Sequence, residues 1–250
     1  MLSFQNPISL TYLPNPISHI LCYAYLRGTM KKAFIFDLNG TMVDDMGFHA
    51  EAWGTIINNE LNGNLSHAQV KKEMYGKNEE VLERVFGKGK FTPEEMDKLS
   101  IRKEEMYQDA FRPHLQLING LQQFLQKAYE RNIPMAIGSA AIPFNINFVL
   151  DNLNIRHYFS AIVSADDVEK SKPHPQTFLD AAEKLGVQPG DCIVFEDAPK
   201  GVETALNAGM QAVAITTTHE PDEFKQYENI LLFIRDYTDE RLTKFFLTYP

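Results

Sequence analysis

Polar residues follow several short apolar segments, and together they have the chemistry needed for phosphoryl transfer. Asp37 ends AFIFD, Ser139 ends MAIGS, and the adjacent acids Glu196 and Asp197 end CIVFED. Lys172 lies in the loop KSKPHP. In-line displacement at phosphorus needs a nucleophilic carboxylate, a hard cation held by acids, and a lysine and a hydroxyl that neutralise phosphoryl oxygens. The set of residue types matches that requirement.

Each of these residues also has an ordinary structural explanation when it is considered alone. Asp37 could close an Asx turn, and Ser139 could cap the helix expected from about residue 142. Lys172 could be a solvated lysine. Glu196 and Asp197 could be two solvated loop acids. If they are buried instead, a cation or hydrogen-bond donors must compensate their mutual repulsion. The combination of segments, more than any one of them, favours a single site.

Five apolar segments predict the buried strands that would carry these residues: 33–37, 135–139, 161–166, 192–197 and 211–216. Helical periodicity links the later ones, at 119–132, 142–155, 174–186 and 198–209. This alternation predicts an α/β fold in which a parallel sheet carries helices on both faces. Because ligands bind at the carboxyl ends of such strands, the fold would bring the polar residues together.

A helical block interrupts the alternation after the first strand. Its segments have helical periodicity, and Ser66 and Thr92 are residue types that cap helix N-termini. We therefore predict a helical cap domain of residues 46–112, inserted into a core domain of residues 30–45 and 113–250. The segment DYTDERLTKFFLTYP predicts a terminal helix that closes the core.

The first 29 residues contain three prolines and no positively charged beginning, so they are a poor secretory signal. Met30 directly precedes KKAFIF, a suitable start for a domain with a buried first strand. We predict that Met30 is the natural start and that residues 1–29 are a mis-assigned or disordered extension. An atypical targeting segment is the alternative.

Bulk composition narrows the function classes. The chain of 250 residues has 24 basic and 33 acidic residues and a formal net charge of -9, which argues against a nucleic-acid-binding surface. No run approaches the roughly 18 apolar residues of a membrane span. Cys22 and Cys192 have no spacing typical of a disulfide framework or a zinc site, so a reducing cytoplasm is predicted. Nothing in the sequence sets an oligomeric state.

Four motifs, DLNGT, GSA, KPHPQTF and FEDAPKGVETALNAGM, resemble the haloacid dehalogenase-like (HAD) hydrolase superfamily. The resemblance covers residues 31 to about 220 and is greatest to the β-phosphoglucomutase and sugar-phosphate phosphatase group, in the branch with a helical cap. It implies a Rossmann-like core and a Mg²⁺-dependent phosphatase that acts on a small phosphorylated metabolite. A β-phosphoglucomutase and a non-catalytic phosphometabolite-binding protein are the alternatives.

The resemblance also assigns roles to individual residues. Asp37 would form an aspartyl-phosphate, while Ser139 and Lys172 would bind the phosphoryl group. The implied magnesium ligands are Asp37, the backbone carbonyl of Asn39, Glu196 and Asp197. Substrate contacts are expected from Gly40, Thr41, Ala140, Gly76 and Lys77. The positions after Gly76 lack the arginine that β-phosphoglucomutases carry there, which weighs against a mutase.

Asn39 departs from the family pattern D-x-D, whose second acid protonates the leaving group and later activates water. An amide cannot exchange a proton in this way, although its backbone carbonyl can still bind a metal. We rank first a native variant that relies on His49 as the acid and base or on a leaving group that needs little protonation. An engineered replacement is another explanation, and so is deamidation of the sequence Asn39–Gly40 to aspartate.

Overall fold

The computed structural model describes residues 32–247, so the prediction for residues 1–29 lies outside the described part of the chain. Six parallel strands form one sheet in the order β3-β2-β1-β4-β5-β6. The strands are β1 Ala33–Phe36, β2 Met135–Gly138, β3 Ala161–Val163, β4 Cys192–Glu196, β5 Gln211–Ile215 and β6 Ile230–Ile234. The predicted α/β fold with a parallel sheet is confirmed.

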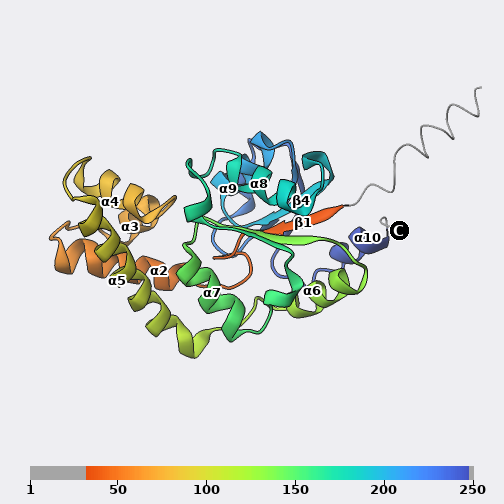
Figure 1. Ribbon diagram of the computed structural model, residues 1–250, viewed down its shortest axis with the longest axis horizontal. Helices are drawn as coiled ribbons and strands as arrows, with labels where there is room; N and C mark the ends of the chain where they lie inside the picture. Colours follow the sequence, from red (N-terminus) through yellow and green to blue (C-terminus); the bar gives the residue numbers. More distant parts are fainter. Residues whose placement is uncertain (1–31, 248–250) are drawn as a thin grey trace, which may run out of the picture. The chain divides into compact units, whose positions relative to one another are not determined.

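Helices cover both faces of this sheet (Figure 1). One face carries α6 Leu121–Glu130, α7 Pro143–Asn152 and α10 Arg241–Leu247; the other carries α8 Gln176–Leu185 and α9 Pro199–Asn207. Successive residues of β1 alternate between the two faces, because side chains of a strand point to opposite sides. Phe34 and Phe36 pack on the first face, while Ala33 and Ile35 pack on the second.

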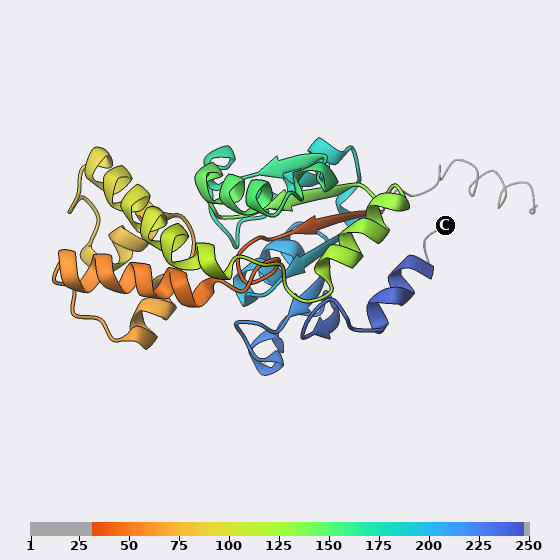
Figure 2. The ribbon, with the colours of Figure 1, turned by 90° about the horizontal axis from the view of Figure 1, so that it is seen from below.

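The helical block follows β1, with α2 Met46–Gly54, the π-helical turn Thr55–Glu60, α3 His67–Glu73, α4 Asn78–Phe86 and α5 Pro93–Phe111. Helices α2 and α5 lie side by side (Figure 2). Ser66 and Thr92 cap α3 and α5 as expected, each accepting a hydrogen bond from a backbone N–H of the first turn. The block has its own apolar cluster, around Trp53, Ile56 and Leu82.

Strand β6 was not expected from the sequence pattern. This strand follows only the short 3₁₀ turn Pro221–Phe224, so the pattern of strand and long helix that revealed the other strands is missing. It lies at the edge of the sheet, and most of its side chains are only partly buried. None of the helices in residues 32–247 has both the length and the apolarity required to cross a membrane.

Candidate active site

Three acids meet at the carboxyl ends of neighbouring strands. Asp37 follows β1, and Glu196 and Asp197 lie at the end of β4, the strand paired with β1. Carboxylate oxygens of the three residues lie within 4.8 Å of one another, and all three residues are buried. The interpretation of Glu196 and Asp197 as solvated loop acids is therefore wrong.

Lys172 bridges two of these acids. Its Nζ lies 2.8 Å from Oδ1 of Asp37 and 2.8 Å from Oε1 of Glu196, and only 9% of the side chain is exposed. The loop after β3 delivers it across the sheet, 135 residues along the chain from Asp37. The interpretation of Lys172 as a solvated lysine is wrong, because its ammonium is the counter-charge of the acid cluster.

Hydroxyl groups and a glycine fix Asp197. Thr41 donates to Oδ1 at 3.0 Å, and the hydroxyl of Thr218, which follows β5, donates to Oδ2. Gly40 has a φ of +75°, and a Cβ there would collide with the Asp197 carboxylate. Glycine is required at residue 40 for both reasons.

Glu196 is held in a similar way at the start of α9. Its Oε2 accepts a hydrogen bond of 2.7 Å from the backbone N–H of Ala198, the N-cap of that helix. A Cβ on Gly201 would overlap the Glu196 carboxyl group, so the first turn of α9 must contain a glycine there. The helix N-terminus stabilises the negative charge.

Burial is the main influence on the pKa values of Asp37 and Asp197. It raises the pKa of Asp37 to about 6, with Lys172 opposing it and Glu196 adding to it. The pKa of Asp197 is raised well above its ordinary value by burial and then by Glu196 and Asp37. Lys172 behaves oppositely: burial alone would lower its pKa, but the two carboxylates together raise it.

This donor set fits a magnesium ion. Mg²⁺ prefers oxygen ligands, and three carboxylates with one lysine leave an excess of negative charge in a buried place. A divalent cation would compensate that charge. The side chains that would hold it are Asp37, Glu196 and Asp197.

Ser139 lies beside the nucleophile candidate. Its hydroxyl interacts with Asp37 and opposes the effect of burial on the pKa of that acid. The same oxygen accepts from the N–H of Ala141 at 3.2 Å. The alternative role as the N-cap of the next helix is wrong, because Ile142 occupies the N-cap of α7. Ala140 follows Ser139 and is partly buried.

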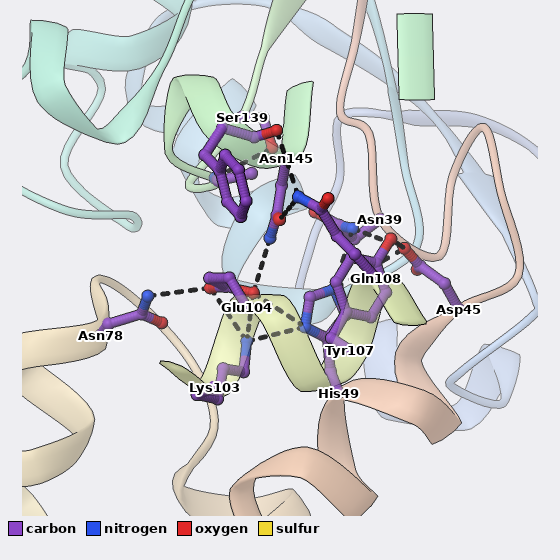
Figure 3. Close-up of polar contacts among 12 residues, drawn as sticks. Asn39, Asp45, His49, Asn78, Lys103, Glu104, Tyr107, Gln108, Ser139 and Asn145 are labelled. Atoms are coloured by element: carbon purple, nitrogen blue, oxygen red, sulfur yellow. Dashed lines mark hydrogen bonds and ion pairs between the residues drawn. The ribbon is translucent and has the colours of Figure 1, made fainter. Parts of the chain in front are cut away.

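The side chain of Asn39 faces Asp45 and His49, at the start of the helical block (Figure 3). Its Nδ2 lies 2.6 Å from Oδ2 of Asp45 and 3.1 Å from Nε2 of His49. The N–H of Gly40 bonds to the Val43 carbonyl at 2.8 Å and to Oδ1 of Asp45 at 3.2 Å. Deamidation requires this nitrogen to attack the side chain of Asn39, so both bonds oppose that reaction.

His49 is buried, which rules out the interpretation as a helix-surface histidine. Its ring stacks on Tyr107 of α5, with 3.7 Å between the ring centroids. Nδ1 lies 2.7 Å from Nζ of Lys103, while Nε2 faces Asn39. A neutral imidazole has one bare nitrogen, so it can accept only one hydrogen bond from these two nitrogen donors.

A second polar network continues from Lys103 (Figure 3). Its ammonium lies 2.9 Å from Oε2 of Glu104, which also accepts a hydrogen bond of 2.6 Å from Asn145 of α7. Asn78, at the start of α4, donates to Oε1 of Glu104 at 2.8 Å. Gln108 donates in turn to Asn145 at 2.9 Å. Glu104 therefore joins the helical block to the core.

Gly76 and Lys77 lie in the loop before α4. Gly76 has a φ of +77°, and Nζ of Lys77 donates to the carbonyl of Val168 at 2.6 Å. This bond attaches the loop to the core. Their predicted contact with substrate stays a prediction.

Sequence reasoning missed several residues of the site. Lys103, Glu104, Tyr107 and Asn145 lie on helices, where polar residues normally indicate a solvated face, and Asp45 is the N-cap of α2. Gly201 offered a signal, because glycine is unfavourable in the first turns of a helix. Thr218 offered another, since it lies in a polar segment just after an apolar strand.

Comparisons with known proteins agree with this geometry. Residues 34–215 match the family described as haloacid dehalogenase-like hydrolase. The fructose-1-phosphate phosphatase of Escherichia coli is 32% identical over 188 residues, which cover 72% of this chain and 94% of that protein. The β-phosphoglucomutase of Bacillus subtilis is 33% identical over 196 residues, covering 74% of this chain and 83% of that protein.

Among solved structures, a β-phosphoglucomutase from Clostridium difficile has a similar fold. The TM-score is 0.76 at 25% sequence identity, and the match covers 88% of this chain and 97% of that protein. The similarity therefore includes both the sheet and the helical block.

Proposed function

The chain belongs to the haloacid dehalogenase-like hydrolases, and from this premise we propose that it is a Mg²⁺-dependent phosphatase of a small phosphorylated metabolite, a sugar phosphate. The observation that carries the proposal is the buried cluster in which Lys172 bridges Asp37 and Glu196 beside Asp197. When bound, Mg²⁺ supplies positive charge that stabilises the phosphoryl oxygens during transfer.

Asp37 is the nucleophile in this proposal. Its carboxylate oxygen attacks phosphorus, the bond from phosphorus to the substrate oxygen breaks, and that oxygen takes up a proton. Water then attacks the aspartyl-phosphate, releases phosphate and restores the carboxylate. The ammonium of Lys172 and the hydroxyl of Ser139, both beside Asp37, are positioned to neutralise phosphoryl oxygens.

His49 is our candidate for the proton transfers that Asn39 cannot perform. Its Nε2 lies 3.1 Å from the amide nitrogen of Asn39, which places this imidazole beside the position of the missing acid. In the first step it would give a proton to the leaving oxygen, and in the second it would take one from water. Lys103 and Tyr107 hold the ring in place.

A mutase remains the second candidate because of the similarity to the β-phosphoglucomutase of Bacillus subtilis. The loop at Gly76 argues for the phosphatase. It continues with Lys77, Asn78 and two glutamates, and Asn78 is bonded to Glu104. A second phosphate group would meet these acids with no arginine from this loop to compensate it.

Phosphate release from a panel of sugar phosphates, acetyl phosphate and pyrophosphate with Mg²⁺ tests the function. We expect release from at least one sugar phosphate, and a loss of about 10⁴-fold or more in Asp37→Ala, which removes the nucleophile. Asp44→Asn is the matched control, because Asp44 is exposed seven residues further along. Turnover that persists in Asp37→Ala would refute the mechanism.

Further measurements test the role of His49 and distinguish the phosphatase from the mutase and from the non-catalytic protein. His49→Ala should slow sugar phosphates more than acetyl phosphate, because the acetyl leaving group needs less protonation. A dependence of product formation on a sugar bisphosphate would favour the mutase. Binding of the panel without turnover would favour the non-catalytic protein.

A further inference from the structure

Asp45 is a buried carboxylate to which the proposed chemistry gives no role. It is fully buried at the point where the chain leaves the core for α2. Asp45 is the N-cap of that helix, a position where aspartate normally accepts a hydrogen bond from a backbone N–H of the first turn. Its side chain forms no such bond. The carboxylate is therefore used for something other than capping.

The carboxylate is directed back toward the loop after β1 (Figure 3). Oδ2 accepts hydrogen bonds of 2.6 Å from Nδ2 of Asn39 and 2.6 Å from the hydroxyl of Tyr107. Oδ1 accepts a bond of 3.2 Å from the N–H of Gly40. Asp45 thus joins the side chain of Asn39, the backbone beside it and helix α5.

These bonds determine which way the amide of Asn39 faces. An ionised carboxylate can only accept hydrogen bonds, so the nitrogen of Asn39, and not its oxygen, must face Asp45. The amide oxygen then points elsewhere. Removing the carboxylate would leave the amide free to rotate by half a turn, which exchanges its donor for its acceptor.

We propose that Asp45 is a positioning residue matched to Asn39, which holds the amide so that its oxygen is presented to the water or hydroxyl that takes part in the reaction. The inference rests on the proposed function for the role of that oxygen. The pair works because one member donates and the other accepts. It follows that the two residues can exchange identities, but neither can change alone.

This matching alters what Asn39→Asp should do. The substitution places a second carboxylate 2.6 Å from Asp45, and like charges at that distance in a buried place repel. Restoring the family's acid at residue 39 therefore does not by itself restore the family's site. The double variant Asn39→Asp/Asp45→Asn reverses the hydrogen bond and keeps one carboxylate and one amide.

The test compares both single variants with the double variant. The first measurement is kcat and KM for p-nitrophenyl phosphate with Mg²⁺. We expect each single variant to lower kcat about 10-fold or more while KM changes less than about threefold, because the substrate still binds. The double variant should return to within about threefold of the parent kcat. Asp44→Asn, an exposed neighbour, should leave both constants unchanged.

The second measurement is the midpoint of thermal unfolding without Mg²⁺. Asn39→Asp should lower the midpoint and the exchange of both residues should recover it. The unfolding midpoint tests whether Asn39 and Asp45 are matched even if the protein proves not to be a phosphatase. A double variant no better than the worse single variant in both measurements would overturn the proposal, as would an unchanged kcat in Asp45→Asn.

Discussion

Between residues 32 and 247, two largely buried lysines lie among acids, and their pKa values are shifted in opposite directions. Lys172, at the carboxyl ends of the strands, bridges Asp37 and Glu196. Lys103, on α5, pairs with the single carboxylate of Glu104. The pKa of Lys172 is raised above its ordinary value, whereas burial lowers the pKa of Lys103 despite the attraction of Glu104.

The acids beside these two lysines also have pKa values that are shifted in opposite directions. Burial raises the pKa of Asp37 to about 6, because one lysine must compensate three clustered carboxylates. Burial alone would also raise the pKa of Glu104, but Lys103, His49 and two amide donors together lower it to about 2. In the second network the positive charge of Lys103 balances the negative charge of Glu104. The carboxylate of Glu104 finds its hydrogen-bond partners within the protein.

The number of carboxylates around each lysine therefore distinguishes two roles of a buried ion pair. A cluster with excess negative charge is unfavourable until a cation binds, and this is typical of a functional site. A balanced pair with amide partners needs no ligand, and here it fixes the contact between the helical block and the core. Three predictions test this difference.

Replacing Lys172 by methionine should have the largest effect. The substitution leaves three buried carboxylates without their counter-charge, so we expect unfolding to become easier by roughly 4 to 5 kcal/mol and activity to fall about 100-fold. Added Mg²⁺ should recover part of the lost stability, as measured by urea unfolding with and without the ion. Lys170→Met is the control, because Lys170 is exposed. The absence of any recovery with Mg²⁺ would contradict the interpretation of the cluster as a cation site.

Replacing Lys103 by methionine should cost less, roughly 3 to 4 kcal/mol of unfolding free energy, because Glu104 keeps its two amide donors. The double variant Lys103→Met/Glu104→Gln removes both charges and should recover about half of that loss. Mg²⁺ should not stabilise either variant more than it stabilises the parent protein. A double variant less stable than Lys103→Met would show that the pair is not balanced.

The smallest effect should be a change in acid stability in Glu104→Gln. The folded-state pKa of Glu104, about 2, lies below its ordinary value of 4.5, so its ionised form stabilises the fold above pH 4.5. This contribution, roughly 3 kcal/mol, should disappear as the pH falls from 4.5 toward 2. The unfolding free energies of parent and variant should therefore converge over that range. Glu105→Gln, at an exposed neighbour, should give a constant difference instead.

Much of the fold followed from the sequence, because short apolar strands and periodic helices are local patterns. All five predicted strands and the four helices between them are present, with boundaries that differ by a few residues. The missed strand, β6, lacks a long helix before it and lies at the sheet edge. The predicted division into core and cap domains and the predicted compartment stay predictions.

The candidate site also contains residues that could be predicted from the sequence to meet and residues that could not. Asp37, Glu196 and Asp197 could be predicted to meet, because each follows an apolar strand and parallel strands bring their carboxyl ends to one edge. Lys172 could be included only through its motif. Of the two partners of Asn39, His49 was expected as the substitute acid and base, whereas Asp45 was not expected, because the turn into α2 brings it there. The bond from Tyr107 to Asp45 depends on the packing of α5 and could not be predicted either.

The parallel sheet, the order of its polar strand-end residues and the departure at Asn39 can be established from the sequence, since they depend on residue types and on neighbours along the chain. The surroundings of Asn39 emerge only when the chain folds. Hydrogen bonds extend over about 3 Å, so the orientation of this amide depends on side chains that folding brings within that distance. One of them is the carboxylate of Asp45, which Tyr107 of α5 holds with a hydrogen bond of its own.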